Sequence, residues 1–252
     1  MWHSPASGGG GRTPWRRHLT LTPQQCKRVL LIGNSRWHWG ERDAFGMHFH
    51  HGSPDLARLD GELGGWAAVG PVPAQLTSAA LERRITLRDV PLAGCPPWLG
   101  VDRAIGAWAG WTRSLDLSLD LSSGLLLVDA GTVLSITVLS PGGEFVGGQL
   151  IPGYRLQLVA MTQGTEALPE MVFAAPEQER FPKDTVAAMR RGVLQAMVSV
   201  VQDAQKACGG VLWLCGGDAE LLATELRSSS PQLQLDPELQ LRGLFDLLDA
   251  SG

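Results

Sequence analysis

An apolar strand that runs directly into an acid, a glycine and a threonine restricts the fold of this chain more than any other feature. Leu126-Leu127-Val128 is followed without a break by Asp129-Ala130-Gly131-Thr132. An acid at the end of a buried strand is costly to desolvate unless it is paired, so its placement predicts a cation or a phosphate nearby. Gly131 lets backbone amides approach an anion, and Thr132 adds a hydroxyl. We therefore interpret this segment as a phosphate-handling turn.

The composition limits the kind of protein to which such a turn can belong. The chain has 252 residues, of which 44% are hydrophobic and 18% charged, which is typical of one large or two modest globular domains. Its 21 basic and 25 acidic residues give a net charge of −4, so there is no global electrostatic reason to expect nucleic acid or an anionic membrane as a partner. No run approaches the roughly 18 apolar residues of a spanning helix.

The cysteines indicate the cellular compartment, and the composition of the first residues indicates whether they are ordered. Cys26, Cys95, Cys208 and Cys215 show no paired metal-ligand spacing, and nothing upstream resembles a secretory signal. We therefore expect reduced thiols and a cytoplasmic location. Residues 1–25 are rich in Gly, Pro and Arg, and such a segment cannot bury enough apolar surface to offset its ordering entropy. They are predicted to form a mobile extension.

Hydrophobic periodicity and turn residues predict a mixed α/β chain. Strands are expected at residues 29–32, 66–69, 85–87, 125–128, 134–139, 144–146, 211–214 and 233–235. Helices are expected at residues 75–84, 104–111, 184–207 and 218–226, and around Leu241, Leu244, Phe245 and Leu248. The segment 114–123 contains only Leu, Ser and Asp, and we interpret this low-complexity stretch as a domain boundary between residues 26–120 and 121–252.

Three of these expected strands end in glycine turns. The turns are Gly33-Asn34-Ser35, Asp129-Ala130-Gly131-Thr132 and Cys215-Gly216-Gly217. One such turn alone would be weak evidence, because many strands end in glycine. Three in one mixed α/β chain predict a nucleotide-binding cleft between two related halves.

The motifs, taken in order, resemble those of the type III pantothenate kinases, members of the acetate-kinase, sugar-kinase, Hsp70 and actin superfamily. The resemblance covers residues 29–226. It is carried by Gly33-Asn34-Ser35, Gly100-Val101-Asp102-Arg103, Asp129-Ala130-Gly131-Thr132, the segment Gly147 to Gly153, Thr185 with Gly192, and Gly216-Gly217. The ordered set is specific, although no single member would be. It implies two RNase H-like (actin-like ATPase) halves, each a mixed sheet flanked by helices, with a cleft between them.

The resemblance also implies an activity, which is ATP-dependent phosphorylation of the primary hydroxyl of pantothenate, the first step of coenzyme A synthesis. Asp102 would be the catalytic base. The pantothenate site would comprise Gly100, Val101, Arg103 and Thr185, with Thr185 reaching the substrate across a homodimer interface. The ATP site would comprise Gly33, Asn34, Ser35, Gly131, Thr132, Gly216 and Gly217. Asp129 would position Mg²⁺, and a monovalent cation (K⁺ or NH₄⁺) would bind near it.

The sequence departs from the family pattern at the first and third turns. The first turn in the family begins with an Asp two residues before the glycine, where this chain has Leu31. A threonine is usual in the family where this chain has Cys215, and Ser35 replaces another threonine but keeps the hydroxyl. The loss of the carboxylate at Leu31 should weaken metal or phosphate handling, unless Asp129 and Asp102 suffice.

Each candidate residue has a purely structural alternative. Asp102 could be a helix cap with Arg103 as its surface partner, and Thr185 beside Asp184 could be an N-cap. The ordered motif set favours the functional interpretation of Asp102. His48, His50 and His51 lie close together, but without matching carboxylate spacing an exposed turn is favoured over a metal site.

Two rival functions follow from the same residues. A non-catalytic accessory or regulatory binding protein of the same family would keep the cleft and lose turnover, and Leu31 favours it. A different superfamily kinase or phosphatase could act on a sugar or an acyl phosphate. The segment Gly100 to Arg103 argues against that second rival, since it matches the pantothenate motif.

Overall fold

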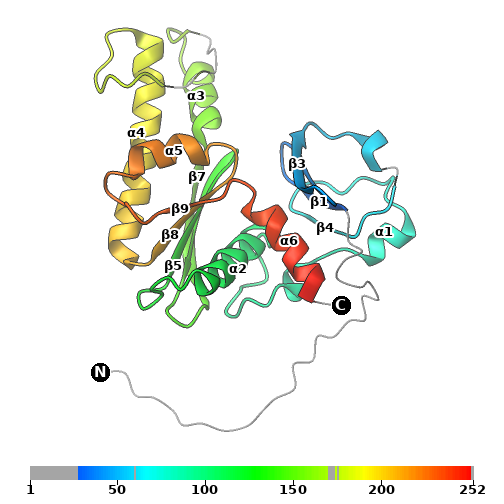
Figure 1. The fold of residues 1–252 in the computed structure, drawn as a ribbon. Helices are drawn as coiled ribbons and strands as arrows, with labels where there is room; N and C mark the ends of the chain where they lie inside the picture. Colours follow the sequence, from blue (N-terminus) through cyan, green and yellow to red (C-terminus); the bar gives the residue numbers. More distant parts are fainter. Residues whose placement is uncertain (1–27, 60, 170–173, 175, 251–252) are drawn as a thin grey trace.

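The computed structural model describes residues 28–59, 61–169, 174 and 176–250, so the expected extension at 1–25 and Cys26 lie outside the described residues. Two mixed sheets with helices packed on and between them make up the described chain (Figure 1). The first sheet contains β1 (Arg28–Ile32), β2 (Trp37–Asp43), β3 (Gly46–Gly52) and β4 (Gly65–Ala68). The second contains β5 (Leu125–Ala130), β6 (Val133–Leu139), β7 (Phe145–Pro152), β8 (Val211–Cys215) and β9 (Gln234–Leu235).

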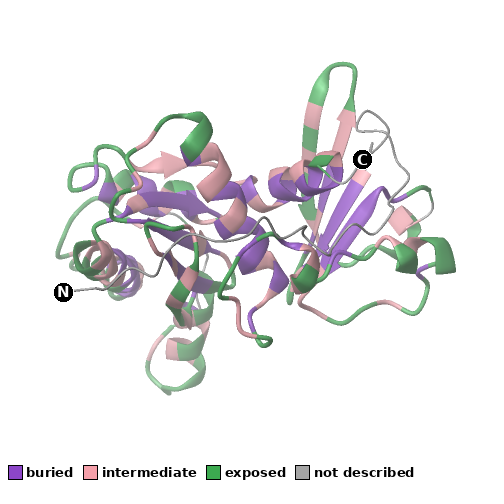
Figure 2. Ribbon diagram, turned by 90° about the horizontal axis from the view of Figure 1, so that it is seen from below, coloured by how far each residue is buried: buried purple, intermediate pink, exposed green. Residues whose placement is uncertain are grey.

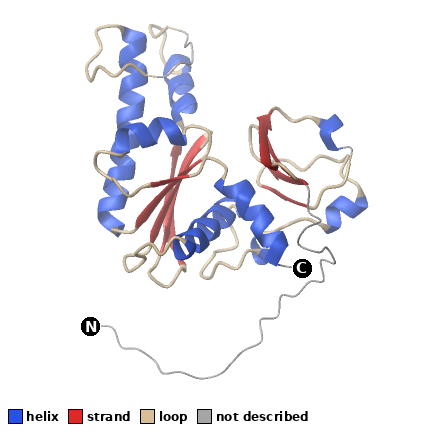
Figure 3. Ribbon diagram, in the orientation of Figure 1, coloured by secondary structure: helices blue, strands red, loops and turns tan. Residues whose placement is uncertain are grey.

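The helices are α1 (Ser78–Glu82), α2 (Val101–Asp116), α3 (Tyr154–Gln163), α4 (Thr185–Cys208), α5 (Ala219–Leu226) and α6 (Leu239–Ala250). Two 3₁₀ turns, η1 (Leu56–Leu59) and η2 (Leu87–Asp89), complete the described elements. Figure 3 shows that most helices lie against the second sheet, with α6 between the two sheets.

The two sheets repeat one topology. Their strand orders are β3-β2-β1-β4 and β7-β6-β5-β8-β9. In each, an antiparallel meander of three strands is followed by a strand parallel to the first, because β1 pairs with β4 as β5 pairs with β8. This repeat confirms the expected fold of two related halves. It also makes β1 and β5 equivalent, so the turns that follow them occupy matching places.

Both faces of the central strands are buried, which explains why they appear in the sequence as continuous apolar runs rather than alternating ones. In β5, Leu125 and Leu127 face one core cluster while Leu126 and Val128 face another. In β1, Leu31 faces the cluster that Leu125 and Leu127 join. In Figure 2 the buried residues follow the strands of both sheets and the helices between them.

The last helix, α6, joins the two halves. Its apolar stripe, which includes Leu244 and Phe245, belongs to the same cluster as Leu31 and packs against β1 and α2. Next to this stripe, Arg42 of β2 stacks over the Phe245 ring and donates to both carboxylate oxygens of Asp249, at 2.8 and 3.0 Å. The division at residue 120 stays a prediction, and α2 and α6 both pack across it.

Several expected elements are confirmed and two were wrong. The hairpin of β6 and β7, the long helix α4 with its Asp184 cap, and the strand, turn and helix at residues 211–226 are all present. The helix expected at 75–84 is only the short α1, which Thr77 caps. Residues 85–87 form no strand, since an isolated bridge at Arg84 leads into η2. The helix α2 continues into the low-complexity stretch 114–123 as far as Asp116.

The β2–β3 hairpin was not predicted. Its β3 strand reads Gly-Met-His-Phe-His-His-Gly, and the cluster of His48, His50 and His51 lies on this strand instead of in an exposed turn. The strand is recognisable only from its partner, because its exposed face carries histidines and its other face packs Met47 and Phe49 against the core. Pairing with β2 overrides the weak local signal.

Candidate active site

The three glycine turns expected to handle phosphates come together in the fold. The Thr132 hydroxyl donates to Ser35 Oγ at 3.2 Å, which joins the first turn to the second across 97 residues. The amide of Asp218, just after the third turn, donates to the Ala130 carbonyl at 2.9 Å. We call the three turns, residues 33–35, 131–132 and 216–217, the turn cluster. The parallel pairing of β5 with β8 places the ends of these two strands side by side, and the contact between Thr132 and Ser35 brings the turn after β1 to them.

Gly216 allows the third turn to approach the second. It has φ = 88°, and a Cβ at this position would overlap Asp129 Oδ1 and the Ala130 carbonyl. A residue with a side chain would be strained in this backbone conformation and would also displace the acid. Among the described residues, no atom lies within 4 Å of a Cβ built on the neighbouring Gly217, so the two glycines meet different constraints.

Asp129 lies inside β5, one residue before the strand ends, opposite Ser135 of β6 and Cys215 of β8. Its Oδ2 accepts a hydrogen bond from Gln240 Nε2 at 2.8 Å. Burial raises the pKa of the Asp129 carboxyl to about 7, and the nearby charge of Asp102 contributes to that rise. The site therefore holds an acid whose negative charge is poorly compensated by the protein itself.

Ser135 supplies a second oxygen on the same face. Its hydroxyl is buried and has no hydrogen-bond partner within the part of the chain that the structure describes. Because directly opposed residues of an antiparallel pair project to one face, Ser135 and Asp129 project together. An uncompensated carboxylate beside an unpartnered buried hydroxyl fits the hard oxygen ligands that a Mg²⁺ or K⁺ ion takes.

Asp102 occupies the second residue of α2, as expected. Its Oδ1 accepts from the Arg103 amide at 2.7 Å, and Gly100 holds the N-cap position with no side-chain bond. Burial raises the pKa of the Asp102 carboxyl, while the bond from the Arg103 amide works against that rise. Asp102 is therefore not the N-cap of the helix.

Arg103 is buried and its guanidinium donates hydrogen bonds to β6 of the second sheet. Its Nε donates to Thr137 Oγ1 at 3.1 Å, and its Nη2 donates to the Ile136 carbonyl at 3.0 Å. The alternative of a surface partner for Asp102 is therefore wrong. Burial lowers the pKa of the guanidinium, whereas Asp102 and Asp129 act to raise it. A Cβ on Gly148 of β7 would overlap the Ile136 carbonyl and crowd Arg103, so this glycine is needed for close approach rather than for a loop.

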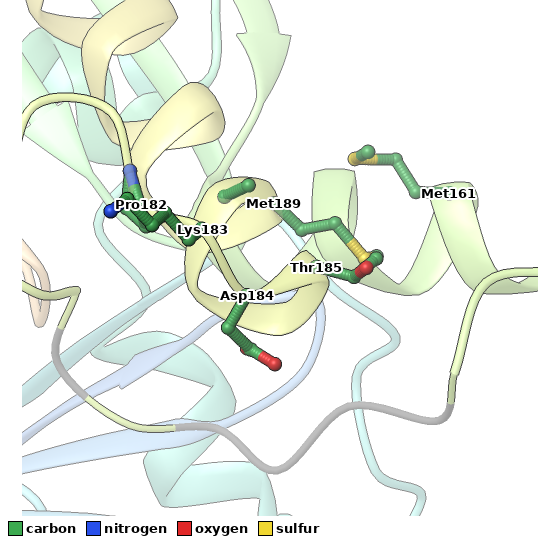
Figure 4. Close-up of a pocket in the computed structure, with 7 residues that line it drawn as sticks. Met161, Pro182, Lys183, Asp184, Thr185 and Met189 are labelled. Atoms are coloured by element: carbon green, nitrogen blue, oxygen red, sulfur yellow. The ribbon is translucent and has the colours of Figure 1, made fainter.

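Thr185 is the expected site residue that lies apart from the turn cluster. It is the first residue of α4, while Asp184 is the N-cap and accepts from the Ala187 amide at 3.0 Å. Figure 4 shows Thr185 lining a pocket with Lys183, Met161 and Met189. In Figure 1 the ends of α3 and α4 that form this pocket rise beyond the second sheet, away from α2. Within one chain the structure does not bring Thr185 to Asp102.

The two departures from the family pattern are both buried. Leu31 is 4% exposed and packs in the core cluster with Val29 and Leu244. Cys215 is fully buried, and burial raises the pKa of its thiol well above the ordinary value, with Asp129 adding to the effect. Both side chains are therefore packing groups here, and the Cys215 thiol stays protonated.

Two residues at this site were not predicted from the sequence. Gln240, at the start of α6, and Ser135, in the middle of β6, have no motif that marks them. Ser135 had one available signal, because it follows Asp129 by the spacing of a tight hairpin that aligns the two residues. Gln240 had none, since it follows Asp129 by 111 residues.

Comparison with known proteins places this geometry in a family. The pattern of the type III pantothenate kinases matches residues 92–207. A type III pantothenate kinase of Synechococcus elongatus is 35% identical over 251 residues, which cover 88% of this chain and 96% of that protein. The chain belongs to the type III pantothenate kinase family. Another member, from Synechocystis, is 31% identical over 220 residues, covering 82% of this chain and 83% of its own.

Solved structures support the fold assignment of this family member. A Campylobacter jejuni protein assigned provisionally to the Baf family of transcriptional activators superposes with a TM-score of 0.62 at 20% identity, covering 88% of this chain and 98% of its own. The activator of 2-hydroxyisocaproyl-CoA dehydratase from Clostridium difficile, solved with ADPNP, gives a TM-score of 0.50 at 11% identity over 89% of this chain and 95% of its own. At these identities the likeness concerns the fold, which is the actin-like ATPase fold expected.

Among the described residues, no helix is long and apolar enough to cross a membrane.

Proposed function

We propose that this protein transfers the terminal phosphoryl group of ATP to the primary hydroxyl of pantothenate. The observation that carries the proposal is the placement of Asp102 and Asp129, near enough that the charge of one raises the pKa of the other, beside three converging glycine turns. Phosphoryl transfer needs an aligned hydroxyl, a carboxylate to orient it and donors for the phosphate charge. These are the groups that the fold gathers here.

Asp102 is the proposed catalytic base. One of its oxygens is held by the Arg103 amide, which leaves the other to accept the proton of the pantothenate hydroxyl as it attacks. Burial raises the pKa of this carboxyl, and a base is most effective when its pKa lies nearer the working pH. The fixed backbone contact keeps the carboxylate oriented without neutralising it.

The turn cluster is the proposed ATP-phosphate site. A phosphate can approach the backbone closely at Gly33, Gly131, Gly216 and Gly217, since no side chain intervenes at a glycine. The amides of Gly33 and Gly216 donate to the Arg36 and Pro237 carbonyls, so the amides of Gly131 and Gly217 are the proposed phosphate donors among these four. Asn34, Ser35 and Thr132 add polar side chains, and the 3.2 Å contact between the two hydroxyls places them where both can turn toward an anion.

Asp129 is the proposed cation ligand, with the Ser135 hydroxyl beside it. When bound there, Mg²⁺ would neutralise phosphate charge, and K⁺ or NH₄⁺ could occupy the same acidic site. The raised pKa of Asp129 and the unpartnered Ser135 hydroxyl support a cation, because a positive ion would compensate both groups. Gln240 holds the carboxylate in place for it.

The substrate side is proposed to include Gly100, Val101 and Arg103 from one chain and Thr185 from a second copy. Thr185 lies apart from Asp102 in a single chain, which supports a homodimer in which α4 reaches the partner's site. Arg103 is held by β6, so it would attract the pantothenate carboxylate from a fixed position. The free thiols of Cys95, Cys208 and Cys215 support a reducing, cytoplasmic location.

Coupled ATP turnover with pantothenate, with and without potassium, tests the activity. We expect pantothenate-dependent turnover that Asp102→Asn lowers by about 10²-fold to 10⁴-fold, the range of a lost general base. Asp116→Asn is the matched control, since Asp116 is the exposed last residue of the same helix. Turnover without pantothenate would overturn the proposed substrate, and an active Asp102→Asn variant would overturn the role of that residue alone.

The rival function, a non-catalytic binding protein of the same family, is favoured by one observation. The buried Leu31 occupies the position where the family has an acid. This rival predicts that ATP and pantothenate bind with no turnover under any cation. The same turnover assay, combined with calorimetric binding of both ligands, separates the two functions.

A further inference from the structure

His38 stands in the first half at the register position that Ser135 holds in the second. Leu31 is directly opposite His38, as Asp129 is directly opposite Ser135. Leu31 and Asp129 each lie two residues before the glycine of their turn. Leu31 replaces the acid of the first turn, but His38 on the neighbouring strand provides a polar side chain on the same face of the sheet.

The imidazole of His38 lies against the first phosphate turn. A Cβ built on Gly33 would be 3.2 Å from His38 Nε2. Its other ring nitrogen, Nδ1, is 2.8 Å from His51 Nδ1. His51 Nε2 in turn is 2.9 Å from Glu238 Oε1. The three side chains form a hydrogen-bond chain that starts at the turn and ends at an acid just before α6.

The acid at the far end of this chain keeps one oxygen without a partner. Glu238 Oε2 is buried and has no hydrogen-bond partner within the described residues. The residue before it, Pro237, accepts from the Gly216 amide at 3.2 Å. The hydrogen-bond chain therefore runs from the first glycine turn, at Gly33, to the residue next to Pro237, which holds the third glycine turn.

The chemistry of the chain determines what His38 presents to a ligand. Glu238 accepts, so His51 Nε2 carries a proton. With both imidazoles neutral, His51 Nδ1 accepts from His38 Nδ1–H, and His38 Nε2 is a bare lone pair. One further proton on the pair makes both ends donors, so that His38 Nε2–H faces the turn while Glu238 balances the charge.

The free protein favours the neutral state of His38. Burial lowers the pKa of His38 to about 4, with His51 and Arg36 contributing to that fall, and Glu238 acts to raise it. An anion at the turn would act in the same direction as Glu238. Binding of a phosphate group and uptake of a proton by the pair should therefore favour each other.

We propose that His38 is a further ATP-phosphate contact of this protein, held at the Gly33 turn by the chain through His51 to Glu238. The inference rests on the proposed kinase function. It adds His38 to the proposed phosphate site and couples uptake of a proton to phosphate binding. His38 would provide, from across the β1–β2 pair, the polar group that Leu31 does not provide. His51 and Glu238 are positioning residues, since they act through His38.

Calorimetric titration of the full chain with Mg²⁺-ATP and, separately, with adenosine tests the proposal. His38→Gln should weaken ATP binding by about 10-fold to 100-fold, as for a lost charge-assisted hydrogen bond, and leave adenosine binding unchanged. His51→Gln should weaken ATP binding less. His50→Gln is the matched control, because His50 lies on the same strand and is exposed on its opposite face.

The proton provides a readout that a purely structural role would not alter. Titrations near pH 5.5 in buffers of different ionisation enthalpy should show more proton uptake with ATP for the wild type than for His38→Gln. A coupling of about 10-fold to 100-fold would raise the pKa of His38 from about 4 to about 5–6 in the complex. Equal ATP affinity and equal uptake in the two proteins would overturn the inference. Equal loss of adenosine and ATP affinity would also overturn it, since it would show a structural role.

The outcome can be separated from that of the proposed function. If the wild type binds ATP without phosphorylating pantothenate, the function fails while the His38 contact can still be measured. If pantothenate turnover is normal and His38→Gln binds ATP as the wild type does, the inference fails while the function stands. Thermal unfolding of each variant checks that the hairpin is intact.

Discussion

Gln240 Nε2 donates to Asp129 Oδ2 at 2.8 Å, which ties the start of α6 to the end of β5 across 111 residues. Gln240 also packs its Cγ against Gly106 of α2, where a Cβ on that glycine would be 3.2 Å away. The helix that fills the core between the two sheets therefore also orients the acid at the turn cluster. Packing and the candidate chemistry are coupled through this one side chain.

Replacing Gln240 should make Asp129 harder to ionise. Gln240→Ala removes a donor that favours the charged carboxylate, so the pKa of Asp129 should rise above its value of about 7. The acidic limb of the kcat/KM profile should then move to higher pH. Gln232→Ala, at an exposed glutamine, is the control. An unchanged profile in Gln240→Ala would show that the contact does not tune the acid.

Asp129→Asn should stabilise the protein at high pH. The pKa of Asp129 is raised from an ordinary 3.8 to about 7, so between these values the native state holds more protons than the unfolded chain, and stability falls as pH rises. The variant lacks this penalty. Its free energy of unfolding should exceed that of the wild type by up to ~4 kcal/mol above pH 7, with the difference shrinking toward pH 4.

Urea unfolding at pH 5 and pH 8 measures this effect, with Mg²⁺ added in a second series. Mg²⁺ should stabilise the wild type more than Asp129→Asn, because a bound cation compensates the charge that the variant lacks. The same pH dependence in both proteins would show that Asp129 is well solvated in the native state, contrary to its burial in the structure.

Gly216→Ala should be much more damaging than Gly217→Ala. An alanine at 216 would adopt φ = 88° and overlap Asp129 Oδ1, whereas no atom of the residues that the structure describes lies within 4 Å of a Cβ at 217. We expect Gly216→Ala to lose ~1–3 kcal/mol of stability and most of its ATP affinity, while Gly217→Ala keeps its stability. Chemical unfolding and ATP titration of both variants provide the comparison, and equal effects would contradict the close approach of the third turn to Asp129.

Mixed dimers test whether Thr185 acts across a subunit interface. Asp102→Asn and Thr185→Val chains should each be inactive alone. If Thr185 reaches the partner's site, a dimer of one chain of each kind has one intact site, with Asp102 from one subunit and Thr185 from the other. Refolding the two inactive chains together should then restore up to about a quarter of the wild-type turnover, because about half of the dimers are mixed in random assembly. No restoration would place Thr185 in its own chain's site or outside the site altogether.

Local signals in the sequence accounted for the elements whose partners are close in the chain. The stop of α4 at Gly209, with φ = 66°, and the β6–β7 hairpin around Pro141-Gly142-Gly143 follow from capping and turn chemistry. The hairpin of β2 and β3 did not, because its strands carry tryptophans, histidines and charges whose fit depends on the sheet they join.

The same distinction applies to the site. The order of the glycine turns and the Gly100 to Arg103 motif identified the family, because each turn is a short segment whose backbone requirements are visible in its own residues. The tertiary structure alone brought Gln240 to Asp129, Ser135 into the same layer and Glu238 through His51 to His38. Contacts between residues this far apart depend on how sheets and helices pack, and packing depends on the whole set of apolar faces rather than on any local pattern.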